Sequence, residues 1–563
     1  MCAQLGGQPI LIMKEGTKRT RGKDAMDNNI SAAIVIAEAV RTSLGPRGMD
    51  KMLVDQFGDV VITNDGATIL KEIDVQHPAG KMMVEVAKTQ DSEVGDGTTT
   101  SVILAGELLK RAKKLLEQKI HPTVITEGFR KAAEKGVEIL NEMSIKSGVD
   151  DAEGLKNCAM TCMSSKIVSE SKDYLADICI DAIKAIAEQV DGKWVADIEK
   201  VQIQKKEGES IDDTSLIKGI ILDKEVVNPG MKKSVKDAKI LLLQSALEIE
   251  KTEFDSKYQI TSPEQIQMFL DEEENMLRKM VDKIKNSGAT VVICQKGIDD
   301  MAQHFLAKAG IMAVRRVKKS DIEKLAKATG GTIFNSLDDV TAEQLGWAGL
   351  VEERKIMNDS WIFIEECKDP KSVVILIRGG TELITDEVDR AIHDALCVVR
   401  DVVEDQKIVG GGGAPELETA IQLRKYASTL GGREQLAVEV FADALDIVPK
   451  TLAENAGLDQ IDILMKLRAA HQQGNKFAGH DIDTGEIVNN MMEVGVVEPT
   501  AVKVQAIKSS TEAANMILRI DDVIAGAKSA MPDMPPGAGG MPPGMGGMGG
   551  MGGPGMGGMP PGM

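Results

Sequence analysis

Aromatic residues are scarce in this sequence, at 3% of 563 residues, whereas methionine is abundant, with 30 residues. Any surface that holds apolar partners must therefore be built from Met, Leu and Ile, whose flexible side chains favour adaptable contacts. The composition is otherwise that of an ordinary soluble globular protein, with 43% hydrophobic and 27% charged residues. A chain of this length exceeds what one hydrophobic core supports and predicts roughly two to four domains.

An excess of basic charge is also lacking. The sequence holds 87 Asp and Glu against 67 Lys and Arg, which gives a formal net charge of -20 and a pI near 5.0. Nucleic acid and anionic membranes would repel such a surface, so we expect no nucleic acid and no membrane among the partners. Proteins, or small molecules bound together with a metal ion, are the expected partners.

Long apolar runs and ordered cysteine patterns are missing. No segment approaches the roughly 20 apolar residues that span a bilayer. The apolar segment at residues 9–13 precedes its basic cluster, which is the wrong order for a secretion signal. The seven cysteines are odd in number and scattered, and Cys158 and Cys162 have no His or further Cys nearby to complete a metal site. We therefore expect reduced thiols in a cytoplasmic protein.

The sequence has no Gly-x-x-x-x-Gly-Lys-Ser/Thr loop, which excludes the commonest kind of ATPase. It has instead the segment Gly95–Thr100, Gly-Asp-Gly-Thr-Thr-Thr, followed at once by an apolar-periodic helix pattern. Two glycines let the backbone approach an anion, and the first helical turn directs free N–H groups at it. Asp96 would be repelled by phosphate oxygens unless a hard metal such as Mg2+ lay between them. The alternative is a simple helix cap, since Asp and Thr are favoured N-cap residues.

Other turns punctuate helices at both ends of the chain. Gly45 and Pro46 stop a helix expected over about 24–44. The turn Asn64–Ala67 follows a predicted strand pair and opens the next helix. The glycine run 410–413 opens a further helix, and Val497–Pro499 precedes a last helix expected over about 500–524.

The middle of the chain has a different pattern. Short apolar strands at 239–243, 290–294 and 312–314 alternate with helical segments, which is typical of an α/β layer. A capping pattern beginning at Ser262 predicts a long helix to about residue 285, within an insertion that we expect to project as an arm. The Gly-, Met- and Pro-rich tail at 528–563 cannot bury enough apolar surface to fold and is expected to be disordered.

Taken together, these residues resemble a group II chaperonin subunit, the family of the archaeal thermosome. The resemblance covers essentially the whole chain, and its motifs are specific in combination and order. They are Leu44-Gly45-Pro46, Asn64-Asp65-Gly66-Ala67-Thr68, Gly95 to Thr100, Ser164-Ser165-Lys166, His393-Asp394-Ala395-Leu396, Gly410 to Pro415, Gly432-Arg433-Glu434-Gln435 and Val497-Glu498-Pro499. The sequence departs from the family pattern in having four glycines from Gly410, where three are usual, and a more polar segment at 480–483. The second departure leaves the base-side contacts of the pocket open.

The resemblance implies a multidomain subunit. A mainly α-helical equatorial ATPase domain would comprise residues 1–147 and 404–527, and a mixed α/β intermediate hinge domain residues 148–217 and 370–403. An α/β apical substrate-binding domain would cover 218–369, with a helical protrusion at about 246–285 that acts as a built-in lid. Such subunits, identical or homologous, assemble into stacked rings around non-native protein clients.

The resemblance also implies ATP and Mg2+ as cofactors. The nucleotide would be surrounded by Leu44, Gly45, Pro46, Asn64, Gly95, Asp96, Gly97, Thr98, Thr99, Gly411, Gly412 and Glu498. Asp96 would hold Mg2+, and Glu498 would lie near the ribose. Asp65 and Asp394 would orient and activate the attacking water, while Lys166 would sense the γ-phosphate. The residue pattern alone does not separate Asp394 from the other acids of its helix, so this assignment rests on the motif.

Two groups of apolar residues are candidates for contacts with clients or the lid: Ile298, Met301 and Phe305, and the arm residues Phe254, Ile260, Phe269 and Leu270. The first group is explained more readily by a helix packed on the strand at 290–294, whereas exposed apolar arm residues indicate binding. The expected function is that of an ATP-dependent molecular chaperone. The alternatives are a small-oligomer ATP-dependent enzyme, such as a small-molecule kinase, and an assembly scaffold that binds nucleotide without hydrolysing it.

Overall fold

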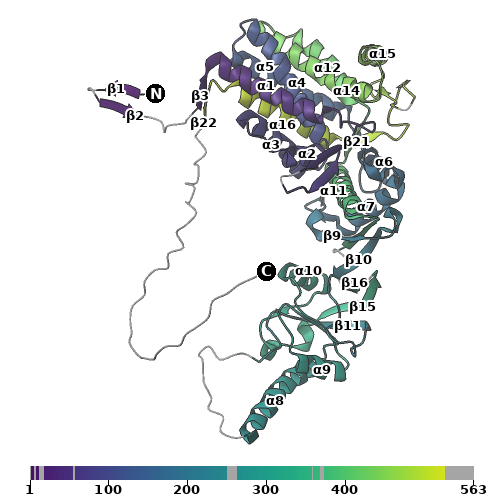
Figure 1. Ribbon diagram of the computed structural model, residues 1–563. Coiled ribbons are helices and arrows are strands. Elements are labelled where there is room, and N and C mark those ends of the chain that lie inside the picture. Colours follow the sequence, from purple (N-terminus) through teal and green to yellow (C-terminus); the bar gives the residue numbers. More distant parts are fainter. Residues whose placement is uncertain are drawn as a thin grey trace, which may run out of the picture. The chain divides into compact units, whose positions relative to one another are not determined.

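The computed structural model describes residues 2–5, 8–11, 18–54, 57–249, 263–357, 359–367, 373–482 and 484–525 (Figure 1). The chain divides into two compact units, one of residues 22–521 and one made of the segments before and after it. The second unit contains two antiparallel strand pairs, β1 (Cys2–Leu5) with β2 (Gln8–Leu11) and β3 (Lys18–Arg21) with β22 (Asp522–Ala525). The expected tail at 528–563 lies outside the described residues.

The last helix is shorter than the sequence predicted. α16 (Thr500–Leu518) ends well before Ile524, because the residues of β22 instead form a ladder with β3. Arg19 Nε donates to Asp522 Oδ1 at 2.9 Å across this pair. The β-branched Val523 and Ile524 suit an extended backbone better than a helix. The expected end at Ile524 was therefore wrong.

Both ends of the larger unit contribute to one helical region. Its main helices are α1 (Gly22–Arg41), α3 (Pro78–Val94), α4 (Thr98–Glu117), α5 (Pro122–Met143), α12 (Ala414–Ala427), α13 (Arg433–Leu445), α14 (Ile447–Asn455), α15 (Gln460–Gln472) and α16. α4 is central, since it packs against α1, α3, α13 and α16 and its first nine residues are all buried. At Gly106 a Cβ would lie 2.3 Å from Ala37 Cβ, so this glycine allows α4 to approach α1 closely.

Short elements lie around the helical region. The predicted strand pair is confirmed as β4 (Lys51–Val54) and β5 (Val60–Thr63), which pair antiparallel and lead into α2 (Gly66–Glu72). A three-stranded sheet has the order β21-β18-β6, from segments far apart in sequence. The bounds of these strands and of a further pair are β6 (Ile145–Lys146), β18 (Lys407–Gly410), β21 (Val497–Pro499), β19 (Gly479–His480) and β20 (Ile487–Val488).

A second region packs around the long helix α11 (Glu382–Asp405). Its other elements are α6 (Ala152–Met163), η1 (Ile167–Glu170), α7 (Lys172–Ile186), β7 (Glu188–Val190), β8 (Lys193–Val195), β9 (Val201–Glu207) and β17 (Val373–Gly379). The apolar side chains that recur at helical spacing along α11, Val388, Ile392, Ala395, Val399 and Val402, are buried in a core shared with α6 and α7. Three acids of α11 are buried as well, Glu387, Asp394 and Asp401. A buried acid on such a helix needs a partner or a function.

The third region is the predicted α/β layer. Its nine-stranded sheet runs β13-β12-β11-β15-β16-β10-β17-β9, with β14 beside β11, and so includes the two strands of the second region. The strands are β10 (Ser215–Leu222), β11 (Ser234–Leu243), β12 (Val291–Cys294), β13 (Met312–Val314), β14 (Ile333–Phe334), β15 (Gly346–Ile356) and β16 (Asp359–Cys367). β10 pairs with β17 before Gly219 and with β16 from Gly219 onward. It therefore crosses the expected domain boundary at residue 217.

Three helices complete this layer: α8 (Pro263–Ser287), α9 (Asp300–Lys308) and α10 (Lys319–Thr329). The C-terminal half of α8 is buried through Leu277, Val281 and Ile284, whereas Phe269 and Leu270 are 46% and 53% exposed. The expected arm residues Phe254 and Ile260 lie outside the described residues.

The candidate client residues on α9 do not form one surface. Ile298, just before the helix, is buried in the α/β core, and Met301 is exposed. Phe305 is partly buried, with the Arg278 guanidinium 5.2 Å from its ring centre. Ile298 is therefore a core residue, as the alternative of a helix packed on the strand predicts, whereas Met301 is accessible to a partner.

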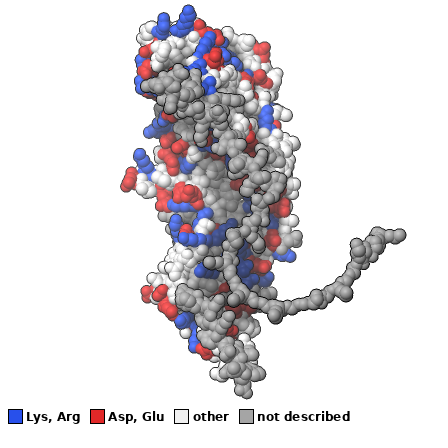
Figure 2. Space-filling view, turned by 60° about the vertical axis from the view of Figure 1, so that its left-hand side comes forward, with Lys and Arg blue, Asp and Glu red and all other residues white. Residues whose placement is uncertain are grey.

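Charged side chains of both signs are interspersed on the face shown in Figure 2, although the whole chain is strongly acidic. Within the described ranges, no helix is long and apolar enough to cross a membrane.

Candidate functional site

The predicted phosphate loop lies between two helices. Gly95 ends α3 and Gly97 begins α4, both in the left-handed conformation at φ 68° and 74° that favours glycine. The N-cap of α4 is Gly97, with no side-chain cap, so the Asp or Thr cap considered from the sequence does not form. Asp96 Oδ1 accepts a hydrogen bond from the Gly97 N–H at 2.6 Å. The α4 N-terminus is thus an uncapped anion site beside a carboxylate.

A second helix N-terminus lies against the first. Asp65 is the N-cap of α2, and its side-chain oxygens accept hydrogen bonds from the N–H groups of Ala67 and Thr68. Its carboxylate also accepts a hydrogen bond from Thr98 Oγ1 of α4 at 2.9 Å. A Cβ on Gly66 would lie 2.6 Å from Thr99 Oγ1 and 2.9 Å from Thr99 N. The absence of a side chain at Gly66 therefore brings the two helix N-termini into direct contact.

The third N-terminus belongs to α12 and follows the glycine run. Gly412 and Gly413 have φ of 67° and 78°, and Gly411 donates to Val496 O at 2.8 Å. Helix α14 connects this run with the loop after α1. A Cβ on Gly413 would lie 3.0 Å from Pro449, and one on Gly45 would lie 2.4 Å from Leu452.

The loop after α1 is also held by its carbonyl groups. Leu44 O accepts from Asn455 Nδ2 at 2.8 Å, and Pro46 follows Gly45 in the same turn. The structure therefore brings the predicted residues of this turn and of the glycine run to one side of α14.

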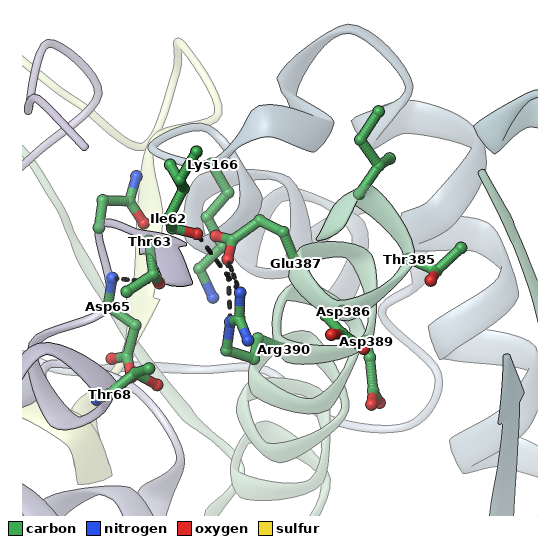
Figure 3. Close-up of polar contacts among 12 residues, drawn as sticks. Ile62, Thr63, Asp65, Thr68, Lys166, Thr385, Asp386, Glu387, Asp389 and Arg390 are labelled. Atoms are coloured by element: carbon green, nitrogen blue, oxygen red, sulfur yellow. Dashed lines mark hydrogen bonds and ion pairs between the residues drawn. The ribbon is translucent and has the colours of Figure 1, made fainter. Parts of the chain in front are cut away.

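The buried pair Lys166 and Asp394 lies in the second region of the fold. Lys166 precedes η1, Asp394 lies on α11, and their side chains form an ion pair from which water is almost fully excluded. Asn64, before α2, donates to Ser165 O, next to Lys166. Figure 3 shows Arg390 of α11 beside Glu387 and the backbone of Ile62 in β5, with Lys166 and Asp65 in the same view. Arg390 donates to Glu387 at 2.6 Å and to Ile62 O at 3.5 Å.

The electrostatics of this pair are unusual. Burial raises the pKa of the Asp394 carboxyl well above its ordinary value, the Lys166 ammonium opposes this rise, and Asp65 and Asp96 reinforce it. Burial lowers the pKa of Lys166, but the nearby carboxylates outweigh burial and hold its pKa above the ordinary value. A buried carboxylate held beside a fixed cation is a candidate to accept a proton from an attacking water.

Glu498 connects the glycine run to the rest of the site. It lies on β21, opposite Val409 of β18. A Cβ on Gly411 would be 2.9 Å from Glu498 Oε1, and Glu498 Oε2 forms an ion pair with Lys503 of α16 at 2.5 Å. The neighbouring Val502 would lie 2.8 Å from a Cβ on Gly97. The first turn of α16 therefore lies between the glycine run and the α4 loop.

Several residues of the site were not predicted from the sequence. Cys162 lies near Asp96, and burial raises the pKa of its thiol well above the ordinary value. Cys397 packs against Gly95, where a Cβ would lie 2.3 Å from Cys397 Cβ. Burial also raises the pKa of Asp91, near Asp65. The sequence pattern of α16 does indicate Lys503. This lysine shares a helix face with the apolar Ala506 and Ile507, and a charge on such a buried face needs a partner.

These residues fit a nucleotide bound with Mg2+. The uncapped N-termini of α4 and α12 supply N–H groups for phosphate oxygens, and the carboxylate of Asp96 is a ligand that Mg2+ prefers. Among the described residues there is no cluster of three or more His, Cys, Asp or Glu side chains suited to a metal ion. A magnesium ion here would therefore be held by Asp96 together with phosphate oxygens and water, as is usual for Mg2+.

Comparison with known proteins identifies the family of this chain. The model of the TCP-1/cpn60 chaperonin family matches residues 36–528. The chain is 60% identical over 543 residues to thermosome subunit beta of Archaeoglobus fulgidus, covering 95% of this chain and 99% of that protein. It is 59% identical over 526 residues to a thermosome subunit of Pyrococcus abyssi, covering 93% and 96%. It is also 57% identical over 523 residues to thermosome subunit alpha of Archaeoglobus fulgidus, again covering 93% and 96%. The chain therefore belongs to the TCP-1/cpn60 chaperonin family.

Proposed function

We propose that this chaperonin subunit binds and hydrolyses Mg-ATP and uses the energy to enclose and release non-native proteins. The observation that carries the proposal is the contact of the α2 and α4 N-termini, through Asp65 and Thr98, beside a buried Lys166–Asp394 pair that the Asn64–Ser165 hydrogen bond ties to the same place. Phosphoryl transfer to water requires positioning, charge neutralisation and an aligned nucleophile. Each requirement has a candidate group in this arrangement.

The roles divide between the two regions. The uncapped N–H groups of α4 and α12 bind phosphate oxygens. Gly411 and Gly412 let the nucleotide approach the backbone, and Glu498 accepts a hydrogen bond from the ribose. Mg2+, held through Asp96, would neutralise phosphate charge. Asp65 and Asp394 orient the attacking water, Asp394 accepts its proton, and Lys166 contacts the γ-phosphate. Because Asp394 and Lys166 come from the second region, hydrolysis depends on how that region closes on the first.

We further propose the domain division implied by the resemblance, with an equatorial domain of residues 1–147 and 404–527, an intermediate domain of 148–217 and 370–403 and an apical domain of 218–369. Relatives named as alpha and beta subunits support assembly with identical or homologous subunits. The family resemblance implies that these subunits form stacked rings, an arrangement that closed symmetry allows. The exposed Met268, Phe269 and Leu270 of α8 offer flexible apolar contacts to clients or to a lid.

The decisive experiment separates ATP binding from hydrolysis. Asp394→Ala removes the proposed proton acceptor and leaves every phosphate-binding N–H group in place. We expect ATP binding to be retained and phosphate release to fall roughly 100-fold or more, the usual contribution of a general base. Asp405→Ala, at an exposed acid at the end of the same helix, is the matched control and should hydrolyse normally. Unchanged phosphate release in Asp394→Ala would instead favour a scaffold that only binds nucleotide or a different catalytic acid.

A further inference from the structure

Three charged side chains from three elements meet beside the glycine run. Lys503 Nζ of α16 lies 2.5 Å from Glu498 Oε2 of β21 and 2.9 Å from Glu416 Oε1 of α12. The side chains of Lys503 and Glu416 are 9% and 7% exposed, whereas that of Glu498 is 21% exposed. Of the three side chains, that of Glu498 is therefore the most accessible to a ligand.

The two oxygens of Glu498 have different surroundings. Oε2 is the atom paired with Lys503, whereas Oε1 is the atom that lies 2.9 Å from the Cβ position of Gly411. An ion pair to one oxygen restricts rotation of the carboxylate and leaves the other oxygen facing the glycine run. Lys503 thus has the geometry to aim Glu498 without itself reaching the ligand.

The charge balance of the cluster also requires Lys503. Glu416 and Glu498 are two carboxylates that face one ammonium, and without it they would repel one another in a site with little water. Burial lowers the pKa of Lys503, but the two carboxylates outweigh burial and keep its pKa above the ordinary value. The lysine therefore stays charged and keeps both acids in place at neutral pH.

We propose that Lys503 is a positioning residue for the nucleotide: by pairing with Glu498 and Glu416 it fixes the Glu498 oxygen that accepts a hydrogen bond from a ribose hydroxyl. This inference rests on the proposed function, because it assigns the ribose of a bound nucleotide to Glu498. It predicts that discrimination between a ribose and a deoxyribose depends on a residue that does not touch the sugar.

The test compares ATP, 2′-deoxy-ATP and 3′-deoxy-ATP on the full-length assembled protein and on Lys503→Met. The cavity beside Lys503 has a volume of only about 10 Å³, which leaves little room for a side chain of another shape. Met has nearly the length of the lysine side chain and is therefore the replacement that disturbs packing least. Wild-type protein should prefer ATP roughly tenfold over the analogue that lacks the hydroxyl bound by Glu498, the usual loss for a hydrogen bond to a charged group. In Lys503→Met this preference should fall to about onefold while kcat at saturating ATP stays within a few fold, since Lys166 and Asp394 are untouched.

Lys156→Met is the matched control. Lys156 also pairs with two carboxylates, Asp173 and Asp177, but on the surface of another region, so its replacement should keep the tenfold preference. If Lys503→Met does not fold, Glu416→Gln/Lys503→Met carries the same test, because it removes one negative charge together with the positive one and should likewise lose the preference.

The outcomes separate the two proposals. Absence of ATP binding by the wild-type protein overturns the proposed function. Binding of ATP without preference among the three nucleotides, or an undiminished preference in a folded Lys503 variant, overturns the positioning role alone.

Discussion

Two buried acids on α11 show how a residue's partners decide its chemistry. Asp394 pairs with Lys166 from another element, whereas Asp401 pairs with its own neighbour Arg400 at 2.7 Å, and Asp401 Oδ2 has no hydrogen-bond partner. Burial raises the pKa of Asp401 to about 7. The same residue type on the same helix is therefore a candidate proton acceptor at one position and a destabilising charge at the other.

Asp401 makes the stability of the fold depend on pH. Its pKa rises from an ordinary value of 3.8 to about 7 on folding, so between these pH values the folded chain keeps a proton that the unfolded chain loses. Stability from this group is fully present below about pH 4 and is lost as the pH rises to 7. Asp401→Asn, which cannot ionise, should gain up to about 4 kcal/mol over the wild type at pH 8. Its weakened pairing with Arg400 reduces that gain.

The measurement is the difference in unfolding temperature between Asp401→Asn and the wild type, at pH 5 and at pH 8. The difference should shift in favour of the variant at the higher pH. Asp282→Asn, at an exposed acid of α8, should show no such change. An equal difference at both pH values would show that burial does not control the titration of Asp401.

Lys166 should control both the rate of hydrolysis and its pH dependence. Lys166→Met removes the cation that lowers the pKa of Asp394 and the charge that would contact the γ-phosphate. We expect single-turnover hydrolysis to fall roughly 100-fold and the acid limb of its pH profile to move to higher pH, because Asp394 would then hold its proton more tightly. A lower rate with an unshifted profile would mean that Asp394 is not the titrating group.

At the scale of elements, the site depends on close contact between the N-termini of α2 and α4. Gly66→Ala would place a Cβ 2.9 Å from the backbone nitrogen of Thr99. A backbone atom in a helix cannot move aside as the end of a flexible side chain can. The two helices should separate by a few tenths of an ångström, and we expect ATP affinity to fall at least tenfold, since the N–H groups of α4 would move away from the phosphates. Gly431→Ala, where nothing lies within 4 Å of the added Cβ, is the control for calorimetric ATP titration. Equal affinities for the two variants would refute this role of the helix contact.

At the scale of the whole molecule, the proposal requires a large closed assembly. Two stacked rings of eight or nine chains, each of 60.5 kDa, have a total mass of about 1 MDa. Mass photometry or analytical ultracentrifugation should find a species of this size, and electron microscopy should show the rings. A monomer or small oligomer at micromolar concentration would instead support the small-oligomer enzyme.

The local sequence determined the parts of this protein that depend on backbone conformation and short-range pattern. Gly95, Gly97 and Gly412 adopt the left-handed conformations that favour glycine, and Asp65 caps α2 as its turn motif indicates. The motifs in their order were also sufficient to predict the family, which the comparisons confirm. These features follow from sterics and hydrogen bonding over a few residues, so the printed sequence contains them.

Only the tertiary structure decided which charges meet. Lys166 and Asp394 are far apart in the chain, as are Glu416 and Lys503, and each pair owes its strength to burial that is created when distant elements pack together. Tertiary pairing with β3 also overrode the helix expected to continue to Ile524. A charge interacts strongly only where neighbouring elements exclude water, and no local pattern in a sequence specifies that exclusion.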